Sequence, residues 1–109
     1  MGGGGTSGIG GGIGDSNSLK PKWPSDNAQL KHIFSDRKGH VVDTPANRKM
    51  IEGAVMDKGN LIGKKQRGGS ELFSKMLDDG SQIWAEVRNG IVQDAGLNDI
   101  PRSFWPGLE

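Results

Sequence analysis

Two turn dipeptides in the second half of the chain constrain its fold more than any other feature. Asp79-Gly80 and Asn89-Gly90 each separate stretches in which apolar and polar residues alternate, and such pairs supply the positive φ that tight hairpin turns need. The alternation has the period of a β-strand over residues 71–77, 82–88 and 91–95. The sequence therefore predicts three antiparallel strands joined as a meander.

Two helices are expected before the strands. Ser25 or Asp26 can cap a short helix that runs to about Phe34 with apolar residues on one face. A second helix begins at Thr44-Pro45, with the proline in its first turn, and fades near Gly59. Helices followed by a meander predict an α+β domain.

The chain divides into a glycine-rich lead-in, residues 1–24, and a folded domain, residues 25–109. Nine of the first 17 residues are Gly, and most of the others are small or polar, a composition that cannot offset the entropy of ordering and so predicts a flexible linker. Gly3, Gly5 and Gly8 match the GxGxxG spacing of nucleotide-binding loops. No predicted strand precedes them and no helix follows, so they lack the context of such a loop.

The charge balance and the lack of cysteine limit the classes of protein to which the chain can belong. With 14 Lys and Arg against 13 Asp and Glu the formal net charge is +1, which does not suit a non-specific nucleic-acid coat protein. Without Cys the chain has no disulfide and can fold in a reducing compartment. No membrane span or secretion signal is recognisable, so we expect any membrane crossing to depend on a larger carrier.

A polar group of side chains is expected on one face of the middle strand. Strand alternation places Trp84, Glu86 and Arg88 together, opposite the aliphatic residues that should pack on the helices. A solvated strand face more often carries Thr, Ser or Lys. We therefore expect a binding or catalytic site on this face.

Two histidines near the first helix complete a set of groups that can cleave RNA without a metal ion. Such cleavage needs a base for the ribose 2′-OH proton, an acid for the departing 5′-oxygen and a cation for the phosphate. His32 lies on the polar side of the first helix and His40 in the loop that follows, and His titrates near neutral pH. Our hypothesis is that they are the acid and the base. Arg88 would bind the scissile phosphate, with Glu86 as the accompanying carboxylate.

Other side chains are candidates for holding the RNA. Lys31 can add charge beside the first histidine, and Trp84 offers a face on which an unpaired base can stack. Lys64 and Lys65 form a local basic cluster. Each candidate also has a structural explanation: a hydrogen-bonded surface His, a solvated lysine loop, an Arg–Glu ion pair or a core Trp.

The motifs argue against a metal-dependent hydrolase. The chain has no HExxH, no paired Asp motif on one strand and no Cys to complete a zinc site. Asp78-Asp79-Gly80 is better explained as a turn, and no Ser has the elbow motif of a nucleophile. We therefore expect neither a metal nor a cofactor.

Several short motifs, taken together, resemble a family of bacterial toxins. They are Leu30-Lys31-His32-Ile33-Phe34, Gly39-His40, Asp43-Thr44-Pro45-Ala46-Asn47-Arg48, Asp79-Gly80-Ser81-Gln82-Ile83-Trp84, Val87-Arg88-Asn89-Gly90 and Gly96-Leu97-Asn98. Over residues 29–106 the chain is similar to the C-terminal toxin domains of contact-dependent growth inhibition, and to those of related polymorphic toxins and bacteriocins.

The resemblance implies a fold, an activity and partners. Members are similar to the barnase, EndoU, colicin and RelE ribonucleases, with N-terminal helices packed on a small twisted antiparallel sheet. Characterised relatives cut tRNA, commonly near the anticodon, and are monomers neutralised by a cognate immunity protein, which we expect to be acidic. The implied protein is a metal-independent tRNase that a larger toxin delivers into the target-cell cytoplasm, where a translation factor could act as helper.

The resemblance also bears on single residues. A tRNA-cutting colicin has a Lys-His pair on an early helix, like Lys31-His32 here, and Asn98 matches the family pattern without a known role. Relatives tend to carry an aromatic-rich stretch where this chain has Lys64-Lys65-Gln66-Arg67-Gly68-Gly69, which leaves the exact tRNA open. Two alternatives also stay open: a non-enzymatic RNA- or protein-binding module, and a toxin nuclease that acts on another nucleic acid.

Overall fold

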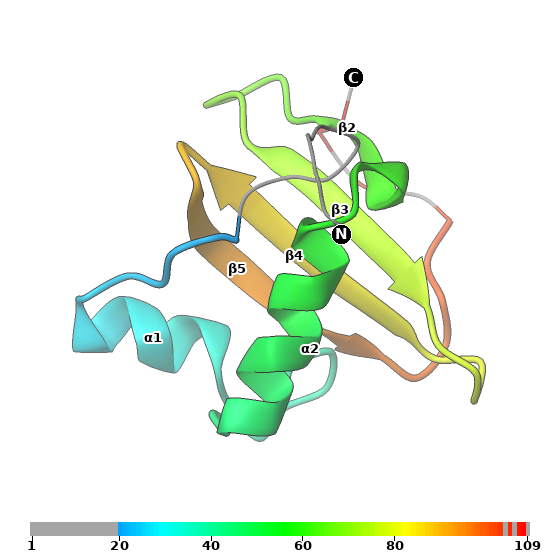
Figure 1. The fold of residues 1–109 in the computed structure, drawn as a ribbon, viewed down its shortest axis with the longest axis horizontal. Coiled ribbons are helices and arrows are strands. Elements are labelled where there is room, and N and C mark those ends of the chain that lie inside the picture. Colours follow the sequence, from blue (N-terminus) through cyan, green and yellow to red (C-terminus); the bar gives the residue numbers. More distant parts are fainter. Residues whose placement is uncertain (1–19, 104, 106, 109) are drawn as a thin grey trace, which may run out of the picture.

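The protein is an α+β domain in which two helices pack against a four-stranded antiparallel sheet (Figure 1). The computed structural model describes residues 20–103, 105, 107 and 108. The elements in chain order are α1 (Asn27–Ile33), α2 (Pro45–Val55), the 3-10 turn η1 (Lys58–Asn60), β2 (Leu61–Lys64), β3 (Glu71–Met76), β4 (Gln82–Arg88) and β5 (Ile91–Asn98). The strands follow the order β2-β3-β4-β5, so the predicted α+β class and meander are confirmed and one strand is added.

Both helices begin at the caps that the sequence indicates. The Asp26 carboxylate accepts the backbone N–H of Ala28 at 3.0 Å, and the Thr44 hydroxyl accepts that of Asn47 at 3.1 Å, so each satisfies a free N–H of a first turn. Pro45 occupies the start of α2, where a missing N–H costs nothing. No helix of the described residues is long and apolar enough to cross a membrane.

The two predicted hairpin turns differ in construction. Asn89 and Gly90 have φ of 54° and 76° and form the expected two-residue turn between β4 and β5. In the other turn only Gly80 has a positive φ, 88°. There the N–H of Leu77 donates to the carbonyl of Ser81 at 2.9 Å, so the turn is longer than a two-residue one. The expectation of two equivalent tight turns is therefore wrong for the first.

One strand was not predicted from the sequence. The first strand predicted from the alternation begins at residue 71, whereas Leu61–Lys64 form β2, which pairs with β3. Leu61 and Ile62 are both exposed, and the pairing shifts register between Leu61 and Gly63. Neighbouring apolar residues that both face solvent break the period-two pattern, so β2 had no signal of its own.

The folded domain begins earlier in the chain than residue 25. Lys22 pairs in parallel with the start of β5, since its N–H donates to Gly90 at 2.8 Å and its carbonyl accepts from Val92 at 3.0 Å. Trp23 packs against the core. Residues 20–24 of the expected flexible lead-in therefore contact the domain, and residues 1–19 lie outside the described part of the chain.

The hydrophobic core lies between α2 and one face of the sheet, with α1 beside β5 (Figure 1). Its buried members are Ile33, Phe34, Ile51, Ala54, Val55, Phe73, Ile83, Ala85, Val87, Val92 and Ala95. The aliphatic face of β4 thus packs as predicted. Trp84, Glu86 and Arg88 lie on the other side of the sheet, which we call the polar face.

A loop between the helices is docked onto the polar face. This loop, residues 35–40, is termed here the histidine loop. The carbonyl oxygen of Gly39 accepts the backbone N–H of Leu97 at 3.1 Å and the indole N–H of Trp84 at 3.2 Å. The same carbonyl oxygen lies against Gly96, so close that a Cβ at position 96 would be only 1.8 Å from it. Only glycine therefore allows the loop to approach the sheet so closely.

Gly96→Ala should destabilise the domain by at least about 2 kcal/mol, because overpacking commonly costs about 1–3 kcal/mol and a backbone carbonyl cannot rotate away. Gly53→Ala is the matched control, since nothing lies within 4 Å of the added Cβ. In the interior of α2 it should stabilise by up to about 1 kcal/mol. Urea unfolding of both variants checks this, and an unchanged free energy of unfolding for Gly96→Ala would show that the loop is not seated on the sheet.

Candidate active site

A β-bulge in β5 brings a second carboxylate to the polar face. The β4–β5 pairing passes from Val87–Val92 to Glu86–Asp94, so Gln93 is an extra residue. Asp94 consequently lies opposite Glu86, among the polar residues of the sheet. Two acidic side chains that face each other across neighbouring strands repel one another unless other groups neutralise them.

Asp94 was missed in the sequence because strict alternation places it on the core side. A two-residue turn without a bulge would pair Gln93, not Asp94, with Glu86. The available signal was the spacing of Val92 and Ala95, which are three residues apart and both buried. The carbonyl of the extra residue is satisfied by the Gln29 side chain of α1, which donates to it at 2.7 Å.

Both histidines lie close to the Asp94 carboxylate. Nε2 of His32, near the C-terminal end of α1, lies 3.6 Å from Oδ2, and Nδ1 of His40, in the histidine loop, lies 3.9 Å from Oδ1. The His32 side chain is 53% exposed and the His40 side chain 12%. The carboxylate thus stands between an open imidazole and an enclosed one.

The enclosed imidazole is held in one tautomer. Nδ1 of His40 lies 2.9 Å from the carbonyl oxygen of Ile33, and a carbonyl can only accept. Nδ1 therefore carries the proton, and the neutral ring has its free lone pair on Nε2. The ring also meets Trp84 edge-on, with centroids 5.6 Å apart.

Burial raises the pKa of the Asp94 carboxyl above its ordinary value, and the carboxylate of Glu86 raises it further. The backbone N–H of Ala95, which donates to Oδ1 at 3.0 Å, and the nearby His40 and His32 offset part of this rise. The net direction is upward because desolvation of the charged form dominates. Asp94 is thus a carboxyl group that retains a proton to higher pH than an exposed aspartate.

Aromatic and basic side chains surround the two carboxylates. Lys65 forms an ion pair with Glu86 at 2.8 Å. A hollow of about 230 Å³ lies beside this pair and is lined by Lys65, Leu72, Trp84, Glu86, Asp94, Arg102 and Trp105. Of these, sequence analysis singled out Lys65, Trp84 and Glu86. Arg102 and Trp105 were not expected here, because their position depends on how the chain after β5 returns over the sheet.

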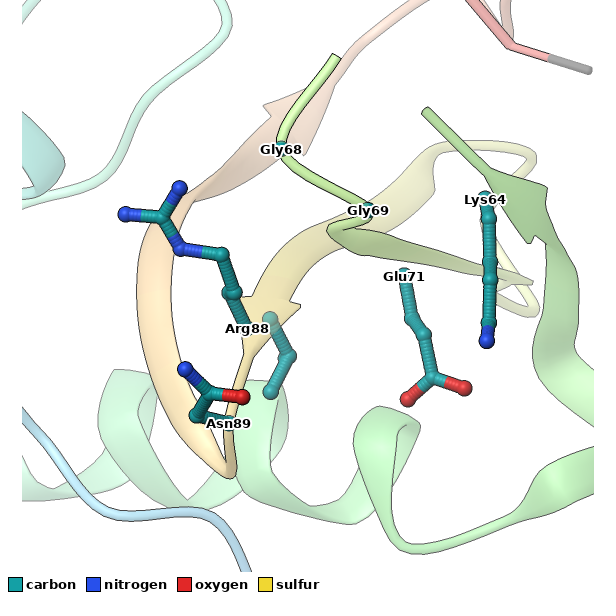
Figure 2. A pocket seen from close by; sticks show the side chains of 7 residues that line it. Lys64, Gly68, Gly69, Glu71, Arg88 and Asn89 are labelled. Atoms are coloured by element: carbon teal, nitrogen blue, oxygen red, sulfur yellow. The ribbon is translucent and has the colours of Figure 1, made fainter. Parts of the chain in front are cut away.

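Two predicted site residues lie in a separate hollow of about 320 Å³, shown in Figure 2. Arg88 and Lys64 line it together with Gly68, Gly69 and other residues. In Figure 2 the Arg88 guanidinium points away from Lys64. The structure therefore does not bring Arg88 to the histidines, although it shares a strand face with Glu86.

The remaining predicted residues flank the site. Asn98 lines a hollow of about 330 Å³ with Lys38 and Arg102, among others, so Arg102 links this hollow to the one beside Asp94. The side-chain amide nitrogen of Asn98 donates to the Gln82 side chain at 3.0 Å. Lys31 is exposed on α1, next to His32 in the chain.

Comparison with known protein families, with curated proteins and with solved structures gave no match to this chain. Among the described residues, no three or more His, Asp or Glu side chains form a group that could hold a metal ion. The interpretation of the site therefore rests on its own geometry. That geometry offers two imidazoles on one carboxyl group, a neighbouring ion pair and an aromatic wall.

Asp94→Asn should make the domain more stable at pH 8. Because the folded pKa of Asp94 is raised, the folded state binds its proton more tightly than the unfolded state does. Stability therefore falls as pH rises from the unfolded pKa of about 3.9 through the folded value, and the loss is complete above it. Asparagine does not ionise and avoids this loss.

Urea unfolding of wild type and Asp94→Asn between pH 4 and pH 8 tests the effect, and the advantage of the variant should shrink toward pH 4. Asp79→Asn is the matched control, because hydrogen bonds from Ser81 lower the pKa of Asp79. It should show no gain at pH 8. A lower stability of Asp94→Asn than of wild type at pH 8 would contradict the assigned environment.

Proposed function

We propose that this chain is a metal-independent endoribonuclease domain of a bacterial competition toxin, and that it cuts tRNA by transesterification from the ribose 2′-OH. The observation that carries the proposal is the meeting of His32 and His40 at Asp94 on the polar face. Two imidazoles on one carboxyl group can accept and donate protons at neutral pH.

The geometry suggests a different role for each histidine. His40 has its free lone pair on Nε2, which suits it to take the 2′-OH proton as that oxygen attacks phosphorus. His32 is more exposed and, when protonated, is attracted by Asp94, which suits it to protonate the 5′-oxygen as its bond to phosphorus breaks. The products are a 2′,3′-cyclic phosphate and a free 5′-hydroxyl.

The phosphate is neutralised by cations other than Arg88 in this scheme. Lys65 and Arg102 line the hollow that Asp94 also lines, so a phosphate beside the histidines lies within their reach. Arg88 and Lys64 would contact phosphates farther along the RNA. Substrate contacts predicted for Lys31 and Asn98 fit positions flanking the histidines.

The toxin assignment rests on the motif resemblance, and the observed fold class supports it. N-terminal helices packed on a small twisted antiparallel sheet are expected of the barnase, EndoU, colicin and RelE group. Delivery by a larger toxin into the cytoplasm of a target cell, a monomeric state and an acidic immunity protein over the polar face follow from the same resemblance. A translation factor as helper is a further part of the proposal.

Total tRNA incubated with the purified domain in EDTA should yield discrete fragments. His32→Ala and His40→Asn should slow cleavage by about 10²- to 10⁴-fold, the usual contribution of a general acid or base. The asparagine amide takes the place of Nδ1 and can still donate to the Ile33 carbonyl, which preserves the loop. Lys49→Ala, an exposed change on α2 across the sheet, should cut as wild type does.

The result also separates the alternatives. Intact RNA with retained binding, both for the domain alone and after addition of translation factors, would show a non-enzymatic binding module. Loss of cleavage in EDTA would show a metal-dependent nuclease, and cleavage of DNA but not RNA would show a different nucleic-acid substrate.

A further inference from the structure

The chain after β5 is fixed across the polar face at two points. Near the start of this segment, the buried Gln82 side chain donates to the backbone carbonyl of Arg102 at 3.1 Å. The same side chain accepts a hydrogen bond from the backbone N–H of Arg102 at 2.9 Å. Farther on, Leu108 pairs with Lys65 beside β2. Figure 1 shows this segment running from the end of β5 toward β2. The described residues after Ile100, which are 101–103, 105, 107 and 108 and which we call the C-terminal strap, are therefore part of the folded domain.

The strap places a second indole beside the one on β4. Trp105 lies 6.1 Å from Trp84 between ring centroids, with the planes tilted by 51°. The hydrogen bond from Trp84 to Gly39 fixes the first ring. Arg102 lies over the face of Trp105 at 4.7 Å, which holds the second ring and presents a cation at the rim.

The hollow between these groups combines two kinds of surface. Its apolar walls are the two indoles and the buried Leu72. Its rim carries Lys65 and Arg102 together with the two carboxyl groups. A purely apolar ligand would leave the charges unsatisfied, and a small anion would not use the aromatic walls. A flat ring with edge N–H groups and an attached phosphate matches both surfaces.

We propose that the C-terminal strap completes a pocket for one unpaired nucleobase, with Trp105 as the ring on which the base stacks, Trp84 as the adjoining aromatic wall and Arg102 at the phosphate side. This deepens and rests on the proposed function, because Asp94 both lines the pocket and contacts the two histidines. A base in the pocket has its ribose and phosphate next to the imidazoles. The domain therefore cuts at unpaired nucleotides, since a base stacked within a duplex cannot enter.

Binding without cleavage tests the pocket directly. A labelled single-stranded octadeoxynucleotide has no 2′-OH and cannot be cut by transesterification, and the same strand in a duplex is the comparison probe. Fluorescence anisotropy at low salt should show wild type binding the single strand more tightly than the duplex. Trp105→Ala should weaken single-strand binding by about 5- to 150-fold, the range for loss of one base stack.

Trp105→Phe keeps an aromatic wall and should retain most of the affinity. Arg102→Ala, an exposed change, should weaken binding severalfold and reduce its salt dependence. Val42→Ala removes exposed apolar surface outside the pocket and should bind as wild type does. Wild-type affinity in Trp105→Ala would overturn the pocket, as would equal binding of duplex and single strand.

Failure of the pocket and failure of the proposed function give different results. If wild type cuts tRNA but Trp105→Ala binds and cuts equally well, the nuclease stands and the pocket is refuted. If wild type binds the single strand through Trp105 but cuts no RNA with or without added translation factors, the pocket stands and the nuclease is refuted.

Discussion

The contact between the Gly39 carbonyl and Gly96 is the constraint on which the polar face depends. One oxygen accepts from the backbone of β5 and from the Trp84 indole, so it joins the histidine loop to two strands at once. The same contact holds His40 over the sheet and fixes the orientation of the Trp84 ring. A side chain at position 96 would lift the loop and separate the enclosed imidazole from Asp94.

The environment of Asp94 lowers the stability of the folded state and also places this carboxyl group beside both histidines. A half-buried carboxyl with a raised pKa weakens the folded state at neutral pH, yet it is the group that both histidines approach. Such a destabilised group within an organised site is common where proton transfer is required. The neighbouring Glu86 is instead paired with Lys65, 2.8 Å away.

Local signals predicted most of the fold but only part of the site. Capping residues such as Thr44 and the Asn89-Gly90 turn act through neighbours in the chain, so the helices and the last hairpin were predictable. The bulge that turns Asp94 outward depends on pairing between strands, and strict alternation misplaces it. Strand alternation also predicted the correct face of the sheet for Arg88, but it could not predict how far Arg88 lies from the histidines. Trp105 joins the site only through the path of the C-terminal strap.

The central claim, cleavage by two histidines through the 2′-OH, is tested most directly by the ends of the RNA fragments. The account predicts a 2′,3′-cyclic phosphate on the upstream fragment and a 5′-hydroxyl on the downstream one, both formed in EDTA. A single 2′-deoxy substitution at the cut nucleotide should abolish cleavage at that position. A 3′-hydroxyl and a 5′-phosphate, or unchanged cutting of the deoxy-substituted RNA, would contradict it.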